Sequence, residues 1–287
     1  MDRRIFLTQA GAWLLPACAA QPPAAAEPVA RLGIVTDIHY ADRATAGTRQ
    51  YRDSIAKLTE AVAQWNSQQV DAVIQLGDFV DASPTVELEL ADLRRVVGVL
   101  REVRAPRYFA IGNHCVFTLT KPQFLEAWGA ERSWYAFPLP GYRGIVLDSA
   151  FTSDGRPYGG REFDWRDAFV PPEQLEWLAA ELRRGGGEPA VVFVHHRLDG
   201  DDHYTVRNAP AVRAVLEASG RVIAVFQGHN HINDYRMIGG IQYCTLKAMV
   251  DGPPPDSSAY GTLEFYPDRG LHLHGFRLLE SRRLAAG

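Results

Sequence analysis

The sequence predicts an α/β layered fold, and three observations support this prediction. Short apolar runs alternate with stretches whose apolar residues recur at helical spacing, which is typical of helices packed on a mainly parallel sheet. The 287 residues are 46% hydrophobic and 22% charged, as in a globular protein with a large core. Polar residues able to bind metals recur just after the expected strands, where open α/β sheets bind ligands.

The first half of the chain shows this alternation most clearly. The apolar run 32–35 predicts a strand that ends before Asp37. Helical spacing predicts a helix over 51–65. Its apolar stripe consists of Tyr51, Ile55, Leu58, Val62 and Trp65. The runs 72–76 and 108–111 predict the next two strands.

A second helix is expected between those strands, because Ser83 is a typical N-cap and Pro84 is favoured in the first helical turn. This helix should run to about Arg104. The later expected helices are 172–183 and 209–218. The later expected strands are 143–148, 190–194, 221–227, 235–238, 241–247, 259–265 and 271–276. No repeat or low-complexity linker divides this region, so we expect one domain over 31–279 and a short tail at 280–287.

Residues 1–30 differ from the rest and predict an export signal followed by an Ala/Pro-rich linker. Arg3 and Arg4 precede an apolar stretch, which resembles a twin-arginine signal. The segment that ends at Cys18 resembles a lipobox, in which this cysteine would carry lipid. We therefore expect export to the periplasm or cell envelope, with membrane attachment only through Cys18. The alternatives are cleavage in the Ala-rich stretch without lipid, or a frayed N-terminus with a chance arginine pair.

Charge and composition exclude several classes of protein. The net charge is -4 and the isoelectric point is near 6.1, so no global positive field attracts nucleic acid. Three cysteines are too few for a disulfide framework or a Cys-rich zinc site. No apolar run reaches the roughly 18 residues that a membrane-spanning helix needs.

Five short segments carry the residues that indicate chemistry. They are Asp37-Ile38-His39, Gly77-Asp78, Gly112-Asn113-His114, Val194-His195-His196 and Gly228-His229-Asn230-His231. Their carboxylate, imidazole and amide groups suit manganese, iron, zinc or cobalt rather than copper(I) or an iron–sulfur cluster. Seven ligand-type groups are too many for one tetrahedral ion and suit two, with Asp78 as the natural bridge. Two such ions would leave positive charge for a phosphate ester and would lower the pKa of a bound water to about 7.

The ordered set D-x-H, G-D, G-N-H, H and G-H-x-H resembles the calcineurin-like metallophosphoesterase superfamily over residues 31–276. The resemblance implies a four-layer α-β-β-α sandwich of two mixed sheets. It also implies a dinuclear-metal phosphoric ester hydrolase, with a small phosphorylated substrate. The sequence leaves open whether that substrate is a phosphodiester or a phosphomonoester.

The resemblance also implies a role for each residue of the five segments. The ligands of the first metal would be Asp37, His39, Asp78 and His231. The ligands of the second would be Asp78, Asn113, His195 and His229. Metal-bound hydroxide would attack the phosphorus, and His114 would act as the general acid that protonates the leaving oxygen. The family register favours His195 over its neighbour His196 as the ligand.

Three positions depart from the family pattern. Cys115 stands where many members have an acidic residue, so we expect a looser orientation of His114. Arg197 stands where many have proline, and it is either a structural arginine or an anion clamp for the phosphate. Asp81 stands where purple acid phosphatases have tyrosine, so we expect no coloured iron–tyrosinate.

Weaker signals concern the substrate. Arg197 and His203 are candidate substrate contacts, although a solvated loop is the simpler interpretation of the region around His203. Trp134 and Trp165 lie in loop-rich stretches and would either pack or stack on a nucleobase. The competing functions are an inactive envelope-binding lipoprotein on the same fold, which the intact ligand set disfavours, and a nuclease, which the acidic balance disfavours.

Overall fold

The structure is a computed structural model that describes residues 26–184 and 186–285. The helices are α1 (Ser54–Gln68), α2 (Val86–Leu100), α3 (Lys121–Trp128), α4 (Pro172–Arg184) and α5 (Ala209–Ala218). The strands are β1 (Ala30–Val35), β2 (Ala72–Gln75), β3 (Arg107–Phe109), β4 (Tyr135–Leu139), β5 (Tyr142–Val146), β6 (Ala190–Phe193), β7 (Val222–Gln227), β8 (Asp234–Ile238), β9 (Ile241–Thr245), β10 (Ala259–Phe265), β11 (Leu271–Arg277) and β12 (Arg282–Leu284). The expected signal residues Arg3, Arg4 and Cys18 lie outside the described residues, so export stays a prediction.

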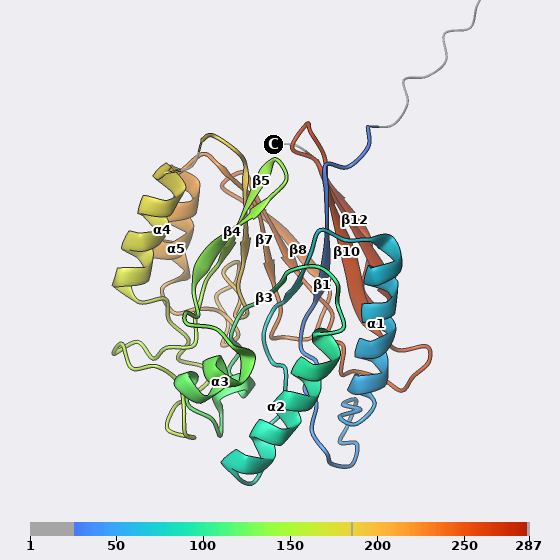
Figure 1. Cartoon of the computed structure of the whole chain (residues 1–287). Helices are drawn as coiled ribbons and strands as arrows, with labels where there is room; N and C mark the ends of the chain where they lie inside the picture. Colours follow the sequence, from blue (N-terminus) through green and yellow to red (C-terminus); the bar gives the residue numbers. More distant parts are fainter. Residues whose placement is uncertain (1–25, 185, 286–287) are drawn as a thin grey trace, which may run out of the picture.

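Two six-stranded sheets face each other, and helices cover their outer faces (Figure 1). One sheet has the order β12-β11-β10-β1-β2-β3 and the other β4-β5-β6-β7-β9-β8. Each combines parallel and antiparallel pairs, as in β1–β2 and β1–β10. Helices α1 and α2 cover the first sheet, and α4 and α5 the second. The predicted four-layer sandwich of two mixed sheets is therefore confirmed.

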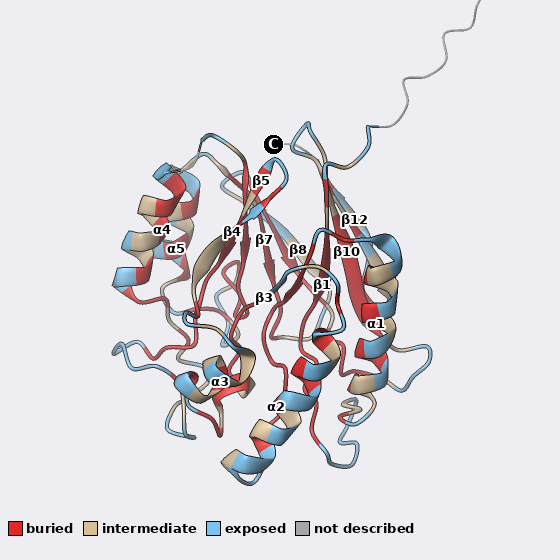
Figure 2. Cartoon of the chain, viewed as in Figure 1, coloured by how far each residue is buried: buried red, intermediate tan, exposed pale blue. Residues whose placement is uncertain are grey.

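The alternation of side chains along each strand explains the layers. In β1, Leu32 and Ile34 are buried between the sheets. Gly33 points the other way, where a side chain would collide with the ring of Trp65 on α1. The 3.6-residue period places the buried residues of each helix on one side (Figure 2). Within the described part of the chain, no helix has the length and hydropathy needed to cross a membrane.

Some elements differ from the sequence-based expectation. Helix α2 begins two residues later than predicted, with Thr85 as its N-cap, because Ser83 instead donates its hydroxyl to Asp92. Helix α3 and strand β4 were not expected, since α3 has only eight residues and β4 contains Pro138, which argues against a strand. The segment 280–287, expected as a tail, contributes β12, which pairs with β11.

Candidate metal centre

The five polar segments follow strands whose carboxyl ends meet at one edge of the sandwich. Strands β1, β2 and β3 run parallel in the first sheet, and β6 and β7 run parallel in the second. Parallel strands end at the same side of a sheet. The structure therefore gathers the candidate ligands, here meaning Asp37, His39, Asp78, Asn113, His195, His229 and His231, together with His114.

One group of candidate ligands combines residues after β1 and β7. The Nε2 atoms of His39 and His231 lie 3.1 Å apart. Asp37 places its Oδ1 atom 3.5 Å from the first of these nitrogens and 3.4 Å from the second. Three converging ligand atoms of this kind can hold one metal ion.

A second group surrounds His195. Its Nδ1 atom donates to the carbonyl oxygen of Leu76 over 2.8 Å, which leaves Nε2 as the acceptor. That Nε2 atom lies 3.2 Å from Oδ2 of Asp78, while the same oxygen lies 3.4 Å from Nε2 of His39. Asp78 therefore lies between the two groups, as a bridging carboxylate must.

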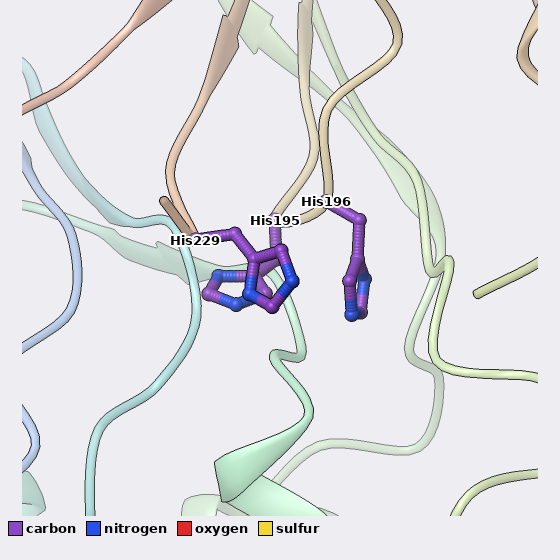
Figure 3. A group of neighbouring side chains, drawn as sticks. All are labelled: His195, His196 and His229. Atoms are coloured by element: carbon purple, nitrogen blue, oxygen red, sulfur yellow. The ribbon is translucent and has the colours of Figure 1, made fainter. Parts of the chain in front are cut away.

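Three histidine rings converge from the ends of β6 and β7 (Figure 3). The ring centroids of His195 and His229 lie 4.9 Å apart, and those of His196 and His229 lie 4.5 Å apart. His196 has its Nδ1 atom 2.8 Å from the hydroxyl of Ser149. Of the adjacent pair His195 and His196, it is His195 that contacts Asp78, so the geometry favours His195 as the ligand.

The backbone at these segments is strained. Asp37, His39, Asp78, His229 and His231 all have left-handed φ angles, between 44° and 76°. Residues with a Cβ atom avoid this region unless the surrounding structure imposes it, and such residues cluster at functional sites. The sharp turn after each strand directs the side chains toward a common centre.

Glycines allow the segments to approach one another. A side chain at Gly112 would collide with the carboxylate of Asp78, and one at Gly77 would collide with the ring of His195. Gly77 also has a φ of 101°. Both positions therefore need glycine, as the sequence patterns G-D and G-N-H predict.

Several ligand atoms are buried without a hydrogen-bond partner among the described residues. They are Oδ1 of Asp37, Oδ1 of Asn113, Nε2 of His195 and Nε2 of His229. An unpartnered buried acceptor costs about 1–3 kcal/mol, so four at one place need an explanation. Two cations, one beside Asp37 and the other beside Asn113, His195 and His229, would satisfy all four, and the donor set therefore fits a dinuclear metal centre.

The local charges are strongly coupled. Burial opposes ionisation of Asp37, but His231 and His39 hold the pKa of this carboxyl well below its usual value. Burial likewise opposes charging of His231, but Asp37 and Asp251 raise its pKa to about 9. A proton on His231 thus balances the Asp37 carboxylate, a role that a bound cation would take over.

Asp81 is a residue beside the candidate site whose contact with His114 the sequence did not predict. Its Oδ1 atom lies 3.1 Å from Nδ1 of His114, and its Oδ2 atom lies 3.5 Å from Nδ1 of His39. Asp81 therefore provides the support expected to be missing because of Cys115, which is a buried free thiol. The sequence pattern that could have indicated Asp81 is G-D-x-x-D, in which Asp81 follows Asp78 by three residues.

A cavity of about 700 Å³ lies near α2, but it contains none of the candidate ligands. The cavity over the metal centre is smaller, about 270 Å³. It is lined by Arg49, Asp78, Asn113, His114, Trp165, Tyr204, His229 and His231. Arg49 donates to Asp81 over 2.9 Å and keeps its side chain about one-third exposed. It places a cation at the cavity that the sequence did not indicate.

The two expected substrate contacts lie outside this lining. Arg197 is 3% exposed and donates to Asp199 over 2.9 Å and to Asp234 over 2.7 Å. Its guanidinium is used in a buried ion-pair network, so the anion-clamp prediction has no support in this geometry. His203 is exposed, with its ring centroid 4.2 Å from that of Tyr204, at the rim of the cavity.

The sequence profile of the calcineurin-like phosphoesterases matches residues 30–233, which contain all five segments. The chain belongs to the calcineurin-like phosphoesterase family. This phosphoesterase is therefore a hydrolase.

Curated relatives of this phosphoesterase include the manganese-dependent ADP-ribose/CDP-alcohol diphosphatases of Oryza sativa subsp. japonica and Arabidopsis thaliana. The rice protein is 28% identical, with 85% of this chain and 91% of the relative covered. The Arabidopsis protein is 27% identical, with 90% and 97% covered. The crystal structure of a dimetal phosphatase from Danio rerio superposes with a TM-score of 0.80 at 23% identity, covering 91% of this chain and all of that one.

Proposed function

We propose that this phosphoesterase is a manganese-dependent diphosphatase that hydrolyses the diphosphate bond of nucleoside-diphosphate conjugates such as ADP-ribose and CDP-alcohols. The observation that carries the proposal is the set of buried, unpartnered ligand atoms around Asp78. The substrate class is taken from the activities of the relatives that match along most of the chain.

We infer that two ions share the Asp78 carboxylate. The first would also be held by Asp37, His39 and His231. The second would also be held by Asn113, His195 and His229. Ions bound there neutralise substrate charge and bring the pKa of a bound water from about 15.7 to near 7.

His114 acts on the leaving group. Its Nδ1 atom faces Asp81, so Nε2 is the atom left to donate a proton to the leaving phosphate oxygen. Burial disfavours the imidazolium, but Asp78 and Asp81 raise the pKa of His114 above its usual value. This shift favours the protonated ring, the form that a general acid requires.

Arg49 suits the second phosphate of a diphosphate. Its side chain borders the same cavity as His114, and its guanidinium donates a hydrogen bond to Asp81. A planar cation in this position can pair with an anionic oxygen without rearrangement. A diphosphate ester places a second phosphate next to the reacting one, whereas a simple monoester does not.

The test is a substrate panel with purified protein. The panel is ADP-ribose, a CDP-alcohol, p-nitrophenyl phosphate, its bis ester and 2′,3′-cyclic AMP, each with manganese or with chelator. We expect ADP-ribose plus water to give AMP and ribose 5-phosphate with manganese, and no turnover with chelator. Turnover of p-nitrophenyl phosphate without cleavage of either diphosphate conjugate would overturn the proposal.

A further inference from the structure

We propose that Trp165, supported by Tyr204, is the platform on which the nucleobase of the substrate stacks. The inference rests on the proposed function, because it specifies where the base of a nucleoside-diphosphate conjugate lies. It concerns two loops, one between β5 and α4 and the other between β6 and α5. The first loop contributes no candidate metal ligand, and the second contributes His195 near its start.

Both rings border the metal centre directly. The ring centroid of Trp165 lies 5.4 Å from that of His229, and the centroid of Tyr204 lies 5.3 Å from it. Both contacts are close to perpendicular, at 74° and 73°. The two aromatic side chains therefore form one wall of the cavity that holds the reacting phosphate.

The size of the cavity places the rest of the substrate over this wall. Pockets that enclose a drug-sized ligand measure roughly 300–1,000 Å³, whereas this cavity measures about 270 Å³. It can take the diphosphate, while the nucleoside must extend across the rim. The other lining side chains are charged or hydrogen-bonding groups, so the aromatic wall is the surface that suits the face of a base.

The two aromatic residues do not behave as core residues. Both are half-buried, and neither belongs to a hydrophobic cluster formed by the described residues. No hydrogen bond of the described residues involves the indole Nε1 atom of Trp165 or the hydroxyl of Tyr204. Each ring thus keeps an exposed surface beside the cavity, which a packing role does not require.

Hydrogen bonds hold the backbone on which the two rings stand. The hydroxyl of buried Tyr158 lies 3.3 Å from the carbonyl oxygen of Trp165 and 3.2 Å from that of Asp164. The second loop is tied to the first, because the backbone N–H of Arg207 donates to the carbonyl oxygen of Ala168 over 2.8 Å. A prearranged aromatic surface loses little conformational entropy when a ligand binds.

The ring geometry defines how the base binds. The centroids of Trp165 and Tyr204 lie 5.6 Å apart at an interplanar angle of 40°. A base between two rings needs about 7 Å, twice the contact distance of carbon atoms. The base therefore stacks on the open face of Trp165, with Tyr204 supporting the indole from the side.

The experiment compares two products of ADP-ribose cleavage that differ in the base. Binding of AMP and of ribose 5-phosphate to the manganese-loaded full-length protein is measured by equilibrium dialysis. Wild-type protein should bind AMP more tightly. Trp165→Ala should weaken AMP binding by about 5- to 150-fold, the usual range for loss of one base–aromatic stack, and leave ribose 5-phosphate binding unchanged. Trp165→Phe should keep most of the AMP preference.

Trp134→Ala is the matched control, because this half-buried tryptophan packs on Phe151 away from the cavity. It should change neither affinity. Equal losses for AMP and ribose 5-phosphate in Trp165→Ala, or no loss in either, would overturn the inference. Binding is measured without turnover, so the outcomes separate the two proposals. If ADP-ribose is cleaved but the preference for AMP does not depend on Trp165, only the platform is refuted. If the preference depends on Trp165 but ADP-ribose is not cleaved, only the proposed activity is refuted.

Discussion

Asp81 holds an oxygen of its carboxylate 3.1 Å from Nδ1 of His114, and both residues are outside the candidate ligand set. The same carboxylate accepts from Arg49 and approaches His39. Burial opposes its ionisation, but hydrogen bonding with His114 and His39 holds the pKa of Asp81 well below its usual value. Asp81 is thus a fixed anion that links the expected general acid, a cation at the cavity and a candidate metal ligand.

Replacement of this anion tests the link to His114. Asp81→Asn keeps the shape of the side chain and removes its charge, so the pKa of His114 should fall and its acid form should be scarcer at neutral pH. We expect the alkaline limb of the pH–rate profile to move to lower pH and kcat for a poor leaving group to fall about 10- to 100-fold. Turnover of p-nitrophenyl esters, which leave without a proton, should change much less.

Asp92→Asn is the control for this variant, because it removes a carboxylate on α2 that binds Ser83 instead. Its pH–rate profile should match that of wild type. An Asp81→Asn profile that also matches wild type would show that the carboxylate does not support the acid.

The bridging role of Asp78 gives a prediction about metal content. Because its Oδ2 atom faces both ligand groups, Asp78→Ala should lose both ions, whereas His114→Ala should keep them. Elemental analysis after manganese loading measures this as ions per chain. Two ions retained by Asp78→Ala would remove the bridge from the proposal.

The two arginines near the site should behave in opposite ways. Arg49→Ala should raise KM for a diphosphate substrate with little change in unfolding free energy, since Arg49 is partly exposed at the cavity. Arg197→Ala removes the nearest cation from the buried carboxylate of Asp199 and should lower the unfolding free energy by about 3–5 kcal/mol. Urea denaturation and steady-state kinetics on both variants measure the contrast, and a large KM effect confined to Arg197→Ala would reverse the assignment.

A buried lysine orders the loop beside His231. The ammonium of Lys57 donates to the carbonyl oxygens of Met249, Asp251 and Gly252, at 2.7–3.0 Å. The carboxylate of Asp251 in turn lies 3.5 Å from Nδ1 of His231. Lys57 therefore holds the loop that supports one candidate ligand.

Lys57→Met should free this loop. We expect a loss of about 2–4 kcal/mol in unfolding free energy from the unpartnered carbonyls, and weaker binding of one manganese ion but not of the other. Metal titration followed by calorimetry measures both affinities. Lys121→Met is the control, because it also removes a buried lysine, which pairs with Asp148 away from the cavity. Equal loss of both manganese ions in Lys57→Met would contradict a role of Lys57 through His231.

Much of the architecture could be predicted because it follows local rules. The apolar runs and helical stripes identify β1 to β3 and β5 to β11, whereas the short elements α3 and β12 show no clear period and Pro138 hides β4. Helix α2 starts later than expected because Ser83 bonds to Asp92 within the helix and its carbonyl oxygen accepts from the distant Thr118 and Arg161. Local propensity cannot register such partners.

The sequence by itself determined which chemical groups follow which strands, and parallel pairing then brings those groups to one edge without further information. Only the tertiary structure decided which loop side chains join them. Asp81 turns toward His114, Arg49 borders the cavity, and Arg197 is withdrawn into ion pairs. The physical reason is that a strand end is positioned by repeating backbone hydrogen bonds, whereas an irregular loop is positioned by its own contacts with distant segments.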